Sequence, residues 1–80
     1  MNRQEVIDKV NQIFIDVFDD ESIKIDEKTT ADDIEDWDSL THITLLNEVE
    51  SVFGFRFGMK EVHGMKNVGE MIDIILMNIK

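Results

Sequence analysis

Three stretches of this sequence place apolar residues at the three- and four-residue steps of an α-helix. The first covers about residues 3–18, the second runs from Leu40 to Phe53, and the third follows Asn67. An amphipathic helix buries its apolar face only against another element, and the alternating segment 55–57 has no second strand with which to pair. The sequence therefore predicts an all-α fold: a small four-helix bundle with three main helices and one short one.

Further residues predict where these helices end and how they are connected. Gly54 offers a left-handed stop to the second helix, and Asn67 with Glu70 three residues later predicts a capping box at the start of the last one. We expect the short helix around Met59–His63. The long first loop, residues 19–38, contains sparse apolar residues that we expect to anchor it to the core: Ile23, Ile25, Ile34 and Trp37. The apolar row expected on the second helix is Ile43, Leu46, Val49, Val52 and Phe53.

Size and composition exclude several classes of protein. The chain of 80 residues suffices for one domain, residues 1–80, but is too short to enclose a deep catalytic cleft as well. It contains no cysteine, and therefore has no disulfide, thiolate metal site or thiol nucleophile of its own. Its first residues do not resemble a signal peptide, and no stretch matches the roughly 20 apolar residues of a membrane span. We expect a cytoplasmic monomer that is not an enzyme.

The negative charge is concentrated in the first loop. The whole chain carries a net charge of -10, and residues 19–38 alone contain ten carboxylates and two lysines, a net charge of -8. Such a surface repels nucleic acid and anionic lipid, and it attracts proteins with basic patches. We therefore expect protein partners, no nucleic acid and no membrane insertion.

Ser39 directly follows Asp38 where the second apolar pattern begins. Aspartate and serine are both strong N-cap residues, and a helix needs only one. If Asp38 caps the helix, the Ser39 hydroxyl lies free in the first turn, where the helix dipole and unpaired amides favour a phosphodiester. The sequence therefore indicates Ser39 as a residue that another enzyme modifies.

Catalysis by Ser39 itself is the weaker interpretation. His42 lies three residues later on the same helical face and could be imagined as a general base. Nucleophilic hydrolysis also needs an orienting acid, an oxyanion hole and a substrate pocket, and no sequence element supplies the pocket. We therefore predict no catalytic residue and expect His42 to be a partly exposed surface residue.

The residues around Ser39 resemble a known family. The stretch 38–40, Asp-Ser-Leu, is followed by an amphipathic helix ending in Phe-Gly at 53–54, then by Val-Gly at 68–69 and Ile-Asp at 72–73. Over residues 38–75 this pattern is similar to acyl carrier proteins. The resemblance implies that Ser39 carries 4'-phosphopantetheine, transferred from coenzyme A by a phosphopantetheinyl transferase. The thiol of that arm would hold an acyl or aminoacyl group as a thioester.

The resemblance also implies a docking surface for partner enzymes, including the transferase and acyl- or aminoacyl-loading ligases and transferases with basic patches. It would centre on the second helix, with a contribution from the short third helix. The implied partner-recognition residues are Asp38, Leu40, Ile43, Thr44, Glu48, Glu50 and Glu61.

Several residues depart from the pattern of fatty-acid carriers. Thr41, Thr44 and Ser51 stand where those carriers commonly have acidic residues, and Trp37 replaces a small residue. These departures favour a carrier dedicated to a secondary or surface-polysaccharide pathway, including aminoacyl carriers, over the housekeeping fatty-acid carrier.

Two alternatives stay open at this point. One is an unmodified helical adaptor that docks by its acidic face. The other is a divalent-metal module, although the acidic cluster lacks the glycine and terminal glutamate of a calcium loop. The carboxylates concerned are Asp32, Asp33, Glu35, Asp36 and Asp38. The identity of the cargo is not encoded in these patterns.

Overall fold

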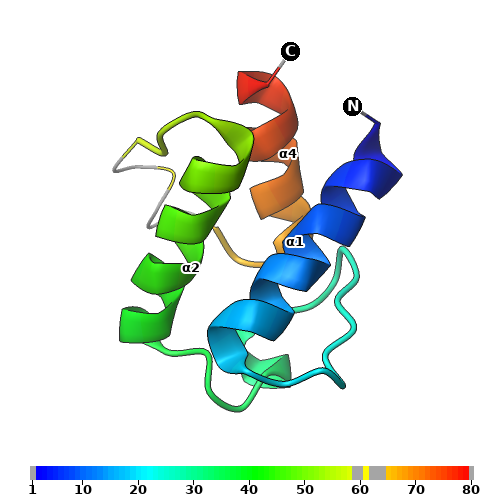
Figure 1. Ribbon diagram of the computed structural model, residues 1–80, viewed down its shortest axis with the longest axis vertical. Coiled ribbons are helices and arrows are strands. Elements are labelled where there is room, and N and C mark those ends of the chain that lie inside the picture. Colours follow the sequence, from blue (N-terminus) through cyan, green and yellow to red (C-terminus); the bar gives the residue numbers. More distant parts are fainter. Residues whose placement is uncertain (1, 59–60, 62–64, 80) are drawn as a thin grey trace.

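The computed structural model describes residues 2–58, 61 and 65–79. The elements within these residues are the helices α1 (Arg3–Phe18), α2 (Ser39–Phe53) and α4 (Val68–Asn78), and the short 3-10 helix η1 (Ala31–Asp33). Helix α1 packs against both α2 and α4, and the long loop between α1 and α2 runs along the side of α1 (Figure 1). The prediction of an all-α fold with a long first loop is confirmed. The short helix predicted at 59–63 lies almost entirely outside the described residues.

The helix boundaries follow from local capping. Helix α1 begins at a capping box in which the Asn2 side chain accepts from the Glu5 amide at 2.8 Å and Glu5 accepts from the Asn2 amide at 3.2 Å. Helix α2 ends at Gly54, whose φ of 74° is the predicted left-handed stop. None of the helices in the described part of the chain is both long and apolar enough to cross a bilayer.

The start of α4 confirms one half of the predicted capping box and corrects the other. The Asn67 side chain accepts from the Glu70 amide at 2.9 Å, as expected. The Glu70 carboxylate does not reach back to Asn67 but accepts from the Lys66 amide at 2.6 Å. Both hydrogen bonds still satisfy amides that have no partner inside the helix.

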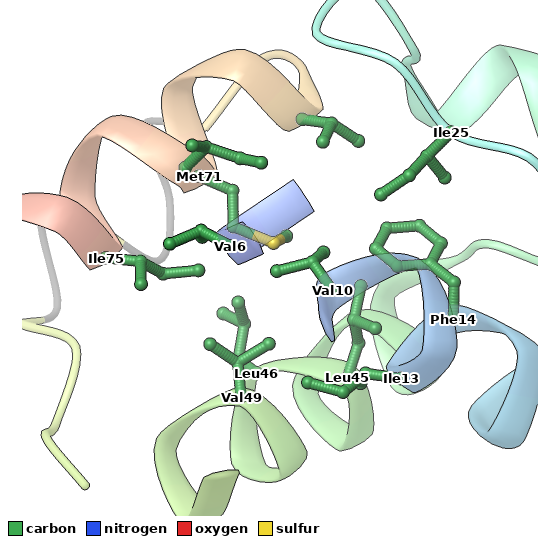
Figure 2. Packing of buried hydrophobic residues seen from close by; sticks show 12 residues of the cluster. Val6, Val10, Ile13, Phe14, Ile25, Leu45, Leu46, Val49, Met71 and Ile75 are labelled. Atoms are coloured by element: carbon green, nitrogen blue, oxygen red, sulfur yellow. The ribbon is translucent and has the colours of Figure 1, made fainter. Parts of the chain in front are cut away.

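One apolar core joins the three helices and the loop. Figure 2 shows side chains of α1, α2 and α4 meeting there, with Ile25 of the loop beside Phe14. The buried apolar residues are Val6, Val10, Ile13, Phe14, Ile25, Leu45, Leu46, Val49, Val68, Met71, Ile72 and Ile75. Ile23, Ile34 and Trp37 are partly buried against this core, which confirms that the apolar residues of the loop anchor it.

The apolar row predicted for α2 is partly wrong. Ile43 is 56% exposed and Val52 is 50% exposed, whereas Leu45, which the row omitted, is fully buried. Successive steps of three residues turn a helix by about 300° each, so a row spaced by threes drifts around the helix axis. The ends of the row therefore leave the face that α1 covers, and Ile43 lies in solvent.

Hydrogen bonds fasten the first loop to α1. The Asn11 side chain accepts from the Ile25 amide at 2.7 Å and donates to the Ile23 carbonyl at 3.3 Å. One amide side chain thus satisfies backbone groups of the loop on either side of Lys24, next to the buried Ile25.

The same loop also caps α4. The Val68 amide donates to the Thr29 carbonyl and the Gly69 amide to the Glu27 carbonyl, each at 2.9 Å. Arg3 joins the Glu27 carboxylate to Asp73 of α4, and its Nη1 lies 2.7 Å from Asp73 Oδ1. These hydrogen-bonded carboxylates raise the pKa of Arg3 above its ordinary value. The loop therefore connects the N-terminal parts of α1 and α4.

Replacing Gly69 tests this packing. A Cβ atom at Gly69 would lie 2.8 Å from the Glu27 carbonyl oxygen, so Gly69→Ala should force the loop and α4 apart and lower the free energy of unfolding by about 1–3 kcal/mol. Helix propensity alone favours alanine by about 1 kcal/mol. Urea unfolding measures the difference, and a more stable Gly69→Ala protein would contradict the close contact.

Candidate functional site

Ser39 is the first residue of α2, and Asp38 is its N-cap. Asp38 Oδ1 accepts from the amides of Leu40 and Thr41, each at 2.9 Å. The Ser39 side chain is exposed, and its hydroxyl has no hydrogen-bond partner within the described part of the chain. The structure thus agrees with the expectation that Asp38 caps α2 and leaves the hydroxyl of Ser39 accessible.

Thr41 completes the cap, a role that the sequence interpretation missed. Its hydroxyl accepts from the Asp38 amide at 2.8 Å, so Asp38 and Thr41 form a reciprocal capping box. The Thr41 hydroxyl also lies 2.9 Å from the Asp36 carbonyl, to which it can donate. The signal was present in the sequence, because a cap residue followed three positions later by a hydroxyl side chain permits this exchange. The threonine at this position therefore fixes the turn that precedes Ser39.

Trp37 forms the wall of the site on the loop side. Its ring packs edge-on against Phe14 of α1, with centroids 5.1 Å apart, and its Nε1 donates to His42 Nδ1 at 3.0 Å. The indole and imidazole rings are also stacked, with centroids 5.8 Å apart. His42 is half-buried, and its Nδ1 is engaged by Trp37 rather than aimed at Ser39. This arrangement gives no support to a serine–histidine catalytic pair.

An open pocket of about 380 Å³ lies beside Ser39. It is formed where the end of the first loop and the start of α2 face the residues just before α4. Its lining residues are Ala31, Trp37, Asp38, Ser39, His42, Met65, Lys66 and Asn67. The sequence did not predict that residues 65–67 contribute to this lining, because they are far from Ser39 along the chain.

The predicted partner-recognition residues fall into two groups. Asp38, Leu40, Ile43, Thr44 and Glu48 are exposed, and Leu40 is 78% exposed. Together with the exposed Ile43 one turn further along, Leu40 gives this face an apolar surface that is suited to contact with another protein. The steps from 40 to 43 and 44 keep three of these residues on one helical face next to Ser39.

The remaining two predicted residues are engaged by the chain itself. Glu50 is half-buried, and its carboxylate accepts from the Phe57 amide at 2.7 Å. Glu61 accepts from the Gly58 amide at 2.7 Å. Both carboxylates thus accept hydrogen bonds from backbone amides of the segment that follows α2.

Some carboxylates of the acidic cluster in the first loop are held by hydrogen bonds within the chain. Among the described residues, no three histidine, aspartate or glutamate side chains converge on a point that could hold a metal ion. Asp33 instead accepts from the Thr30 amide at 2.9 Å, and Asp38 caps α2. Two of the five carboxylates considered for a metal are therefore oriented by backbone amides.

These features define a small helical protein with an exposed serine at the start of a helix. No model of a known protein family matches the chain. Among solved structures, it is similar to the solution NMR structure of a holo acyl carrier protein from Geobacter metallireducens, with 38% sequence identity and a TM-score of 0.85. The similarity covers 90% of this chain and 83% of that chain. The chain therefore belongs to the acyl carrier protein family and is a non-catalytic carrier.

The cap makes stability depend on pH in a definite direction. Hydrogen bonds to the carboxylate, foremost from the Thr41 amide, lower the pKa of Asp38. A carboxyl group with a lowered folded-state pKa contributes stability above its unfolded pKa of about 3.9, and this contribution is lost as pH falls through the lowered value. We expect Asp38→Asn, which can still cap, to weaken the pH dependence of the urea midpoint below about pH 5. If the urea midpoint of Asp38→Asn fell below about pH 5 as steeply as that of the wild type, the Asp38 carboxylate would not be a source of this pH dependence.

Proposed function

We propose that the chain tethers an acyl or aminoacyl group as a thioester on a 4'-phosphopantetheine arm attached to Ser39. The observation that carries the proposal is the accessible Ser39 hydroxyl in the first turn of α2, with the capping role taken by Asp38. Family membership supports the same position, because the Asp-Ser-Leu stretch at 38–40 is the part of the chain that resembles the attachment site of these carriers.

The surroundings of Ser39 fit such an arm. A phosphodiester on Ser39 would lie at the N-terminus of a 15-residue helix, where the macrodipole and first-turn amides favour negative charge. The hydroxyl is exposed, so a transferase can reach it without displacing core residues. The pocket beside Ser39 leaves space for the part of the arm closest to the protein.

Attachment requires only the hydroxyl from this chain. The Ser39 oxygen forms a bond to the phosphorus that bears pantetheine, the bond from that phosphorus to the adenosine bisphosphate part of coenzyme A breaks, and the hydroxyl proton passes to the transferase. The attached arm supplies a thiol, which the chain lacks because it has no cysteine. Asp38 and Thr41 keep the first turn of α2 ordered while the oxygen reacts.

The exposed face of α2 supports a specialised carrier rather than the housekeeping one. Thr44 and Ser51 are exposed and uncharged, and the Thr44 hydroxyl donates to the Leu40 carbonyl at 3.3 Å. Partners that recognise acidic residues at these positions would lose two charge pairs. We infer that the partners are enzymes of a dedicated pathway. Their binding surfaces would contact Leu40 and Ile43 and would carry fewer basic residues.

The attachment site is tested by intact mass. The wild-type chain, incubated with coenzyme A and a broad-specificity phosphopantetheinyl transferase, should gain one arm, whereas Ser39→Ala should gain none. Ser51→Ala is the matched control on the same helix and should be modified like the wild type. The urea midpoint of Ser39→Ala should stay close to that of the wild type, since Asp38 retains the cap. Modification of Ser39→Ala at the wild-type level would overturn the proposal.

The specialised role is tested by adding the missing charges. Exposed ion pairs contribute up to about 1 kcal/mol each, so Thr44→Glu with Ser51→Glu should strengthen association with a fatty-acid-pathway acyltransferase by about tenfold, and by up to about thirtyfold, at low salt. Acyl loading of the arm-bearing protein across a salt series measures this gain. Thr44→Gln with Ser51→Gln controls for side-chain size. If the fatty-acid-pathway enzyme loaded the wild type efficiently and the two glutamates gave no gain, the result would contradict the specialised role and favour the housekeeping fatty-acid carrier.

A further inference from the structure

The pocket beside Ser39 has one charged residue whose role is not explained by the fold. Two of its lining residues, Asp38 and Lys66, carry a full formal charge. Asp38 Oδ1 already accepts two backbone hydrogen bonds at the start of α2. The Lys66 side chain is exposed, and Lys66 has no ion-pair partner among the described residues. Lys66 therefore contributes to the pocket lining a positively charged side chain that has no ion-pair partner among the described residues.

The backbone holds Lys66 in this place. Its amide donates to the Glu70 carboxylate at 2.6 Å, and the next residue, Asn67, is the N-cap of α4. Val68 and Gly69 are in turn hydrogen-bonded to the carbonyls of the first loop. The backbone of Lys66 is thus held next to the loop that leads into Asp38 and Ser39.

The rest of the lining combines apolar and polar surface. Trp37 and Met65 are partly buried against the core and give the pocket apolar walls. His42 and Asn67 add polar groups, and the pocket opens to solvent. Such a lining suits a chain that alternates amide groups with methylene groups, as pantetheine does.

We propose that Lys66 binds the phosphodiester on Ser39 and thereby places the pantetheine chain in the pocket, against Trp37 and Met65. This inference rests on the proposed attachment to Ser39. Covalent attachment makes the binding intramolecular, so the high effective concentration of the arm compensates for a weak contact. Lys66 acts as a positioning residue: it favours one path of the arm over the protein surface and leaves the thioester chemistry to partner enzymes.

The experiment uses the arm-bearing protein with a nitroxide spin label on the thiol of the arm. That thiol is unique, because the chain has no cysteine, and Trp37 provides the sole indole N–H signal. Intact mass first confirms that each variant has taken up one arm, which separates a failure of the attachment site from a failure of this inference. Paramagnetic broadening of the Trp37 indole signal then reports how often the arm lies in the pocket.

Four proteins are compared: wild type, Lys66→Gln, Lys66→Arg and Lys9→Gln, the last removing the same charge from α1. An exposed ion pair changes an equilibrium by up to about fivefold, so Lys66→Gln should shift the ratio of docked to extended arm by up to about that factor and reduce the broadening. Lys66→Arg and Lys9→Gln should keep it, and added salt should lower it in the wild type.

Equal broadening of the Trp37 signal in wild type and Lys66→Gln would overturn the proposal, as would broadening that is no greater at Trp37 than at signals of α1. If Lys66→Gln alone fails to accept the arm, Lys66 serves the transferase rather than the arm, which also overturns it. If no variant accepts the arm, the attachment site itself is wrong.

Discussion

The hydrogen bonds from the Leu40 and Thr41 amides to the Asp38 carboxylate determine where α2 begins. Because one carboxylate satisfies two amides, the next residue enters the helix without any capping role of its own. Ser39 therefore presents its hydroxyl to solvent at the positive end of the helix. The same cap that stabilises the helix thus leaves this hydroxyl accessible, and attachment of the proposed arm requires little more from the chain than an accessible oxygen.

This cap depends on the position of a loop that has little regular structure. Asn11 fastens the middle of the loop to α1, and the carbonyls of Glu27 and Thr29 accept the first amides of α4. Near its end, Trp37 packs on Phe14 and hydrogen-bonds His42. A segment rich in mutually repelling carboxylates is held by a few specific contacts, so the site retains a fixed geometry while its surroundings stay strongly acidic.

The sequence predicts those features that depend on neighbouring residues. The bounds of α1 and α2 and the cap at Asp38 follow from the spacing of apolar residues and from capping residues, which lie only a few positions apart in the sequence. Features that depend on which helices meet were less predictable: Ile43 shares the spacing of Leu46, yet Ile43 is exposed whereas Leu46 is buried. The pocket could not be foreseen, because only the fold brings Lys66 next to Ser39. Likewise, the sequence predicts that Trp37 anchors the first loop, but only the fold shows that its ring packs against Phe14.

In the proposed carrier, Ser39 bears the arm while Asp38 keeps the cap. A phosphorus–proton correlation spectrum of the transferase-treated protein tests both parts in one sample. The account predicts a phosphorus coupling to the β-protons of Ser39, with the amides of Leu40 and Thr41 still protected from hydrogen exchange by their bonds to Asp38. A coupling to the protons of Ser22 or Ser51, or loss of protection at Leu40 and Thr41 on modification, would contradict it.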